Sequence, residues 1–502
     1  MRTLAMKPIG LVLLSIIVLS PITRHTSNWA DQPETVLYGL NSIETSQYII
    51  SDVPYIWQEI NGLCAWAALA IMFQHLGVNV SLNKILDVSG VGFAFYYLRA
   101  DPTLLFYPGP LGSQIPDTQF LADTFGMDIT WYFGEDTEGI GQLKSVIEQQ
   151  GMNVTVLSSF MDGLDQLKLD LENNNPLLVS VNPLRFSTVR DYQVLHLPPD
   201  TIAAHGVVAI GYNDTHIFIN DPGVGSFGTE YGYPTDQRGI AAPIPLEDFQ
   251  LAWQDRSLLA MKLHPRSEYQ HSEELLRSQT IERIISKLEG DYRAYAYAPF
   301  TMWLGADAFV QMGNDLQPSE FEAMLTSWDV YFGNRTQLVN TLPAIKSAYL
   351  GSLTLTYEAM KRAATDLFIL LHDLSRYTPA LNSLTNILSQ FETLVDPAVL
   401  IYPTDESKRT LTLFDNTFDL VVQTLNEGKS IEQAIQSATP QIEALSSQIT
   451  SIGAILSDFT SELKEAQSVS TIFNPQLVLQ LTLIGGGIII GVVLIRRKIH
   501  RE

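Results

Sequence analysis

The sequence predicts an α+β domain over residues 31–265, a helical region over residues 266–470 and a membrane-spanning helix over residues 477–495. Three observations support this order. Short apolar runs separated by glycine and proline are typical of strands and fill the first segment, whereas long patterns with helical spacing fill the second. An uncharged apolar stretch of spanning length follows them. At roughly two hundred residues, the first segment is long enough to bury its own core.

The amino-terminal segment has the pattern of an export signal. Residues 1–30 open with basic residues and continue into an apolar run of signal-peptide length. No clear cleavage site of small residues follows, so the segment is either a signal peptide or an uncleaved anchor. Four Asn-X-Ser/Thr sequons would suit a surface glycoprotein, and they lie at Asn79, Asn153, Asn213 and Asn334.

The carboxyl-terminal segment predicts a membrane anchor. Residues 477–495 contain no charged side chain and are followed by the basic tail 496–502. Because basic flanks stay on the cytoplasmic side, the pattern predicts a single-pass cell-membrane protein with its ectodomain outside and its tail in the cytoplasm. Gly487 and Gly491 form a GxxxG pair that could mark a homodimer face.

The composition excludes several classes of function. The formal net charge is −24, and no cluster of lysine and arginine occurs outside the tail. A nucleic-acid partner is therefore not expected, because phosphate backbones are bound by clustered basic residues. The sequence contains no HExxH motif, no second cysteine and no calcium-binding loop, so we expect neither a metal nor a cofactor.

The first domain alternates predicted strands and helices. Apolar runs predict strands over residues 153–157, 176–181, 206–212 and 216–220. Helical spacing predicts helices after Cys64 and over residues 141–150 and 161–172.

From about residue 266 onward, turn residues become sparse and the pattern is helical. Helices are predicted over residues 272–288, 319–331, 342–377 and 381–394. A last helix is predicted to start at Thr439 and Pro440, with apolar residues three and four apart up to Leu463. This helix forms either a coiled-coil stalk or one member of a bundle that holds the first domain away from the membrane.

Cys64 is the single cysteine of the chain and stands where an apolar helical run begins. An exported protein with one cysteine cannot form an internal disulfide. A thiol at a helix start is well placed to ionise, because free backbone N–H groups and the helix dipole stabilise negative charge there. Cys64 is therefore either a nucleophile or a small buried apolar residue.

A thiol nucleophile needs a base, a group that orients the base, and donors for the oxyanion. His205 opens an apolar strand, and Asp221 closes the next one, so a hairpin could place the carboxylate beside the imidazole. Gln58 precedes the thiol by six residues and can donate its side-chain amide to an oxyanion, together with the backbone N–H of Cys64. His196 is an alternative base that is not followed by a strand leading to Asp221.

Four stretches together resemble the papain-like family of bacteriocin-processing, double-glycine-leader peptidases. They are VPYIWQ at residues 53–58, CAWAALAIM at 64–72, HGVVAIGY at 205–212 and NDP at 220–222. The resemblance covers roughly residues 50–225 and implies a papain-like cysteine peptidase domain. It further implies Cys64 as the nucleophile, His205 as the base, Asp221 as the orienting group and Gln58 in the oxyanion hole.

A second resemblance points to acyl transfer. The stretches GVNVSLNK at residues 77–84 and VSGVGFAFYY at 88–97 look like the amino-terminal domain of butirosin biosynthesis protein H, which is associated with acyl transfer to an amine. Both families imply a thioester on Cys64, resolved by water in a hydrolase and by an amine in a transferase. The predicted export favours hydrolysis of a peptide or acyl substrate, because acyl carrier proteins are cytosolic. An inactive peptide-binding surface protein is the third reading.

Overall fold

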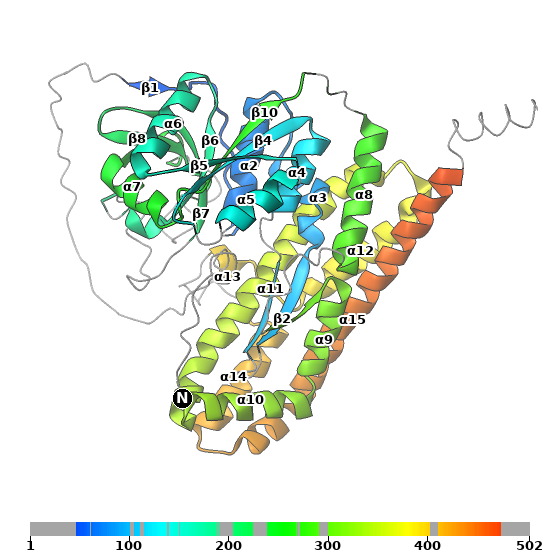
Figure 1. Cartoon of the computed structure of the whole chain (residues 1–502). Coiled ribbons are helices and arrows are strands. Elements are labelled where there is room, and N and C mark those ends of the chain that lie inside the picture. The colour runs from blue at the N-terminus through cyan, green and yellow to red at the C-terminus, as the bar shows by residue number, and fades with distance from the viewer. Residues whose placement is uncertain are drawn as a thin grey trace, which may run out of the picture.

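The computed structural model describes residues 47–472, except for 61, 101–104, 111–114, 138–139, 150, 187, 190–203, 224–237, 268, 270–271, 291–299 and 402–409. Figure 1 shows a sheet domain at one end of the molecule and a long helical bundle beside it. Among these residues, no helix combines the length and the apolar character needed to cross a membrane. The predicted signal segment 1–30, the predicted span 477–495 and the basic tail 496–502 lie outside the described residues.

The first domain is built on an eight-stranded sheet with the order β5-β4-β10-β6-β7-β8-β9, and β1 pairs with β7. Only the β4 and β5 pair is parallel among the paired strands of this sheet. The strands are β1 (Tyr48–Ile49), β4 (Met127–Gly134), β5 (Asn153–Leu157), β6 (Leu177–Val181), β7 (His205–Tyr212), β8 (His216–Asn220), β9 (Ala242–Pro245) and β10 (Ala260–Pro265). All four predicted strands are therefore present, as β5 to β8.

The helices of this domain are α2 (Cys64–His75), α3 (Leu82–Val88), α4 (Ile115–Thr124), α5 (Ile140–Gln149), α6 (Phe160–Glu172) and α7 (Leu246–Gln254), with short 3-10 turns η2 (Val91–Phe93) and η3 (Pro183–Arg185). All of these helices except α3 pack against strands of the sheet. Every residue of α2 from Trp66 to Phe73 is buried. A helix that is apolar on all sides belongs in a core, and α2 packs against β7. The three predicted helices of this domain are confirmed as α2, α5 and α6.

The second region is a helical bundle. Its helices are α8 (Glu273–Glu289), α9 (Ala306–Asp315), α10 (Pro318–Phe332), α11 (Arg335–Leu371), α12 (Thr378–Glu392), α13 (Ala398–Ile401), α14 (Leu413–Asn426) and α15 (Ile431–Ile472), with a 3-10 turn η5 (Ser375–Tyr377). The long helix α15 packs against α8, α9, α10, α12 and α14. It is thus a member of a bundle and not an isolated coiled-coil stalk.

The predicted start of the last helix at Pro440 is wrong. Helix α15 begins at Ile431, and Pro440 lies inside it. The buried apolar stripe is continuous across the proline, since Ile435, Ala438 and Ile442 are all buried. Packing of that stripe against the neighbouring helices outweighs the one backbone hydrogen bond that proline removes.

The second region is also not entirely helical. Strand β11 (Phe300–Leu304) pairs with β2 (Phe95–Ala100), which pairs in turn with β3 (Leu105–Pro110). Figure 1 shows β2 lying among the bundle helices, away from the larger sheet. Helix α3 and the turn η2 pack against α11, and a Cβ atom at Gly92 would overlap Ala363 of that helix. The α+β domain and the bundle therefore share a sheet and a packed interface.

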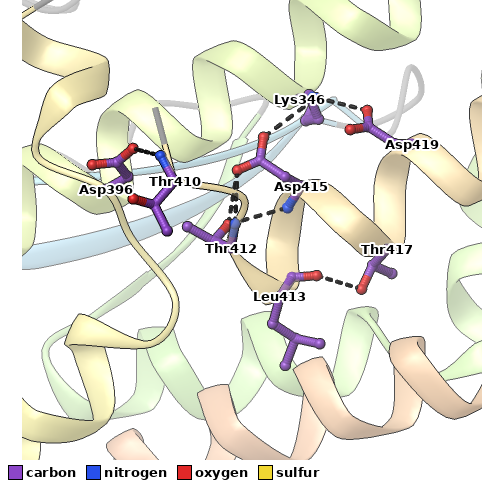
Figure 2. A network of polar contacts seen from close by, with 8 residues as sticks. All are labelled: Lys346, Asp396, Thr410, Thr412, Leu413, Asp415, Thr417 and Asp419. Atoms are coloured by element: carbon purple, nitrogen blue, oxygen red, sulfur yellow. Dashed lines mark hydrogen bonds and ion pairs between the residues drawn. The ribbon is translucent and has the colours of Figure 1, made fainter. Parts of the chain in front are cut away.

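A polar network joins α14 to α11 inside the bundle (Figure 2). Asp396 accepts a hydrogen bond of 2.6 Å from the backbone N–H of Thr410. Thr412 and Asp415 form a reciprocal capping box at the start of α14. Lys346 of α11 lies 3.3 Å from the Asp415 carboxylate. The network fixes the position of α14 against α11.

Candidate active site

Cys64 is the first residue of α2, and Leu63 precedes it as the helix cap. The Leu63 side chain makes no capping hydrogen bond to the backbone N–H groups of this first turn. Those groups and the helix dipole therefore favour negative charge at this end of the helix. The thiol is half-buried.

His205 and Asp221 meet at the end of one hairpin. Strands β7 and β8 pair antiparallel with Asn220 opposite Val208, so Asp221 follows β8 at the end of the sheet where His205 begins β7. The imidazole Nε2 lies 2.6 Å from Oδ1 of Asp221. Both side chains are buried. With Nε2 held by the carboxylate, Nδ1 is the nitrogen left to face the thiol.

Gly206 brings the strand close to the helix that carries the thiol. Its backbone N–H donates to Sγ of Cys64 over 3.5 Å. A Cβ atom at position 206 would lie 3.0 Å from Cα of Ala65. Only glycine lets β7 approach α2 this closely without a shift of the backbone.

The pKa of the thiol is lowered and the pKa of the imidazole is raised, so each shift favours the charged form of its own group. Burial raises the pKa of the Cys64 thiol, but the His205 charge, its hydrogen bond and the Gly206 N–H together outweigh burial and lower it. Burial lowers the pKa of His205, whereas Asp221 and the Cys64 thiolate raise it, to about 10. Both shifts favour a thiolate beside an imidazolium.

A third segment, residues 53–58, packs against the Asp221 loop. The backbone N–H of Gln58 donates to the carbonyl of Pro222 over 2.9 Å, and the Tyr55 hydroxyl donates to the Asp221 carbonyl over 2.9 Å. The Gln58 side chain is fully buried. The Asp221 carboxylate also accepts the Gly223 N–H at 2.7 Å. The structure thus anchors Gln58 to the loop that carries Asp221.

Sequence reasoning missed two residues that hold this segment in place. Asn220 donates its side-chain amide to the Pro54 carbonyl over 3.0 Å and accepts the Ala241 N–H over 3.0 Å. Tyr55 is the second. The available signal for Asn220 was its position directly before Asp221, at the end of an apolar strand, where an amide side chain that becomes buried needs hydrogen-bond partners.

The alternative base His196 lies outside the described residues. Within the part of the chain that the structure describes, no group of histidine, cysteine, aspartate and glutamate side chains is arranged to hold a metal ion.

A thiol paired with a buried imidazole and an orienting carboxylate is the arrangement of cysteine-dependent acyl-transfer enzymes, which include the cysteine peptidases. Residues 50–260 match the model of the Peptidase_C39 like family. This segment is therefore similar to the C39-like peptidases, in agreement with the first of the two resemblances at the level of the family. The match covers the sheet domain and stops before the bundle helices.

The chain is also similar to solved structures. One of them is the crystal structure of a C39-like peptidase from Bacillus anthracis, 18% identical, covering 44% of this chain and 100% of its own, with a TM-score of 0.28. With this TM-score and identity, the similarity supports no conclusion about the fold. No curated protein matches the chain.

Proposed function

We propose that the chain is a cysteine peptidase that cleaves a peptide through a thioester on Cys64. The observation that carries the proposal is the His205–Asp221 pair at 2.6 Å, held beside the Cys64 thiol by the Gly206 N–H that donates to Sγ over 3.5 Å. The interaction of the thiol with His205 lowers the thiol pKa and raises the imidazole pKa. A structural cysteine in an apolar core would have a raised pKa instead.

The proposed reaction uses each of these groups in turn. The Cys64 thiolate attacks the carbonyl carbon and forms a C–S bond, while Gln58 and the Cys64 N–H donate to the oxyanion. The His205 imidazolium protonates the leaving amine as the C–N bond breaks, which leaves a thioester. His205 then takes a proton from water, the hydroxyl attacks the thioester, and the C–S bond breaks to regenerate the thiolate. Asp221 keeps the ring oriented throughout.

Labelling of the purified protein with iodoacetamide as a function of pH tests this proposal. Wild type should show a thiol pKa below the ordinary value of about 8.5. His205→Ala removes the imidazole charge and its hydrogen bond, which lower the thiol pKa. It leaves the Gly206 N–H as the remaining group that lowers this pKa against burial and the Asp221 charge, so labelling at pH 7 should slow sharply. Slow labelling of wild type with no change in the variant would instead favour the inactive peptide-binding protein.

The second half-reaction separates hydrolysis from acyl transfer. A peptide or acyl substrate incubated with the protein should yield the free acid if water resolves the thioester. Formation of an amide only when an amine acceptor is added would favour the acyltransferase suggested by the butirosin-type stretches.

We also propose that the catalytic domain faces the cell exterior and is anchored by residues 477–495. The support is the sequence pattern of that stretch and its basic tail 496–502, with the export pattern of residues 1–30. Protease added to intact cells should remove the domain and leave a membrane-bound carboxyl-terminal fragment. A domain that is degraded only after lysis would contradict this topology.

A further inference from the structure

The long bundle helix α11 contacts the loop that connects Gln58 to Cys64. Arg362 of α11 forms an ion pair with Glu59 of this loop. Leu355 lies against Gly62, where an added Cβ atom would be 2.7 Å from its methyl group. Leu355 and Arg362 are two helical turns apart and share one face of α11. One face of a bundle helix thus contacts both the beginning and the end of the loop.

The loop has a backbone shape that needs support. Glu59 has a φ of 64° and Gly62 a φ of 105°, both in the left-handed region. A non-glycine residue holds such a conformation only where its surroundings impose it. On one side the Gln58 N–H is bound to the Pro222 carbonyl. On the other side, Arg362 binds the carboxylate of Glu59, the residue with the unfavourable φ.

The two ends of this loop carry the two donors of the proposed oxyanion hole. The Gln58 side chain stands at one end and the Cys64 N–H at the other. A change in the loop would alter the spacing between these donors. It would leave the Cys64–His205 pair in place, because that pair is set by the packing of β7 on α2 and by Gly206.

We propose that Arg362 is a positioning residue that acts through Glu59 to hold the Gln58–Cys64 loop in the shape that stabilises the oxyanion. The inference rests on the proposed thiol mechanism and adds that the helical bundle supplies part of the catalytic architecture. The Arg362 side chain is only 16% exposed, so its guanidinium is committed to this interface and is not a freely solvated charge.

Two chemical probes separate this role from a general structural one. Iodoacetamide reacts with the thiolate by displacement and forms no oxyanion, so its rate reports the Cys64–His205 pair. The ester p-nitrophenyl acetate acylates the thiol through a tetrahedral oxyanion, so its burst rate also reports the donors. In Arg362→Met the acylation rate should fall by about tenfold, less than the roughly 10²–10³-fold loss on removal of an oxyanion donor. The pH profile of alkylation should not move.

The matched control is Lys361→Met, which removes the same charge from the adjacent position of α11. Lys361 is half exposed and pairs with Glu358 of its own helix. This variant should acylate at the wild-type rate. Glu59→Gln removes the other partner of the ion pair with little change in shape, and it should reproduce the loss seen in Arg362→Met.

The exchanged pair Glu59→Arg with Arg362→Glu should recover part of the acylation rate. Wild-type acylation by both single variants would overturn the positioning role while leaving the thiol mechanism in place. Equal losses of alkylation and acylation would also overturn it, because they would indicate general disruption. Wild-type protein that shows neither a lowered thiol pKa nor acylation would reject the proposed function itself.

Discussion

The backbone N–H of Gly206 donates a hydrogen bond to Sγ of Cys64 at 3.5 Å, from the residue next to His205. The start of β7 therefore supplies the thiol with an imidazole and with a backbone donor at once. Both lower the thiol pKa and together oppose the effect of burial. The distance between the start of β7 and the amino terminus of α2 therefore influences the thiol pKa.

Gly206→Ala should weaken this arrangement. The new Cβ atom would lie 3.0 Å from Cα of Ala65, so β7 and α2 must move apart by a few tenths of an ångström. We expect the thiol pKa to return toward its ordinary value and the acylation rate to fall by roughly tenfold or more, since a 1 Å displacement can cost about 10²-fold. The pH profile of iodoacetamide labelling measures the pKa.

Gly141→Ala is the matched control for that variant. A Cβ atom at Gly141 meets no other atom within 4 Å, and the residue lies in α5. Its labelling profile should equal that of wild type. Identical profiles for both alanine variants would show that the close approach of Gly206 has no influence on the thiol.

Asp221→Asn should move the alkaline limit of the active pH range to lower pH. The ion pair requires Cys64 deprotonated, with a lowered pKa, and His205 protonated, with a pKa of about 10. Activity should therefore rise through the thiol pKa and decline near pH 10. The Asp221 charge raises the imidazole pKa, so its removal lowers that pKa and moves the alkaline decline to lower pH.

The rate of p-nitrophenyl acetate acylation between pH 5 and pH 11 measures both limbs for Asp221→Asn. We expect its maximum to fall less than the roughly 10²–10⁴-fold contribution of a general base, because the carboxylate only orients and charges the ring. An alkaline limb that stays near pH 10 in the variant would contradict the role assigned to Asp221.

Cys64→Ala should abolish turnover and leave the fold intact. The side chain is small and half-buried, so its truncation should change the free energy of unfolding by less than about 1 kcal/mol. Urea denaturation followed by circular dichroism measures the stability, and substrate cleavage measures activity. Residual turnover at the wild-type rate would exclude the thiol mechanism.

A fragment that ends at residue 265 should not fold as a soluble domain. Truncation removes β11, the partner of β2, and also the helices α8 and α11 that cover α3. Exposed apolar surface and an unpaired strand edge favour aggregation. Co-expression of residues 266–472 should restore solubility if the shared interface is the cause. Cooperative unfolding of the isolated fragment would refute this expectation.

Much of the sheet domain could be predicted because its signals are local. The strands β5 to β8 each correspond to a short apolar run between turn residues, and α2 to an apolar run after Cys64. The start of α15 could not be predicted from Pro440, because helix continuation there depends on burial against the other bundle helices.

The sequence by itself determined the identities and the order of the candidate site residues: Gln58, Cys64, His205 and Asp221. Only the tertiary structure decided how these groups are held, because the contacts that hold them join segments far apart in the chain. The pairing of β2 with β11 and the ion pair of Glu59 with Arg362 are examples. The periodicity of one segment does not indicate which distant segment it contacts, since strand edges and exposed charges can pair in many ways. Packing of the complete chain selects one of them.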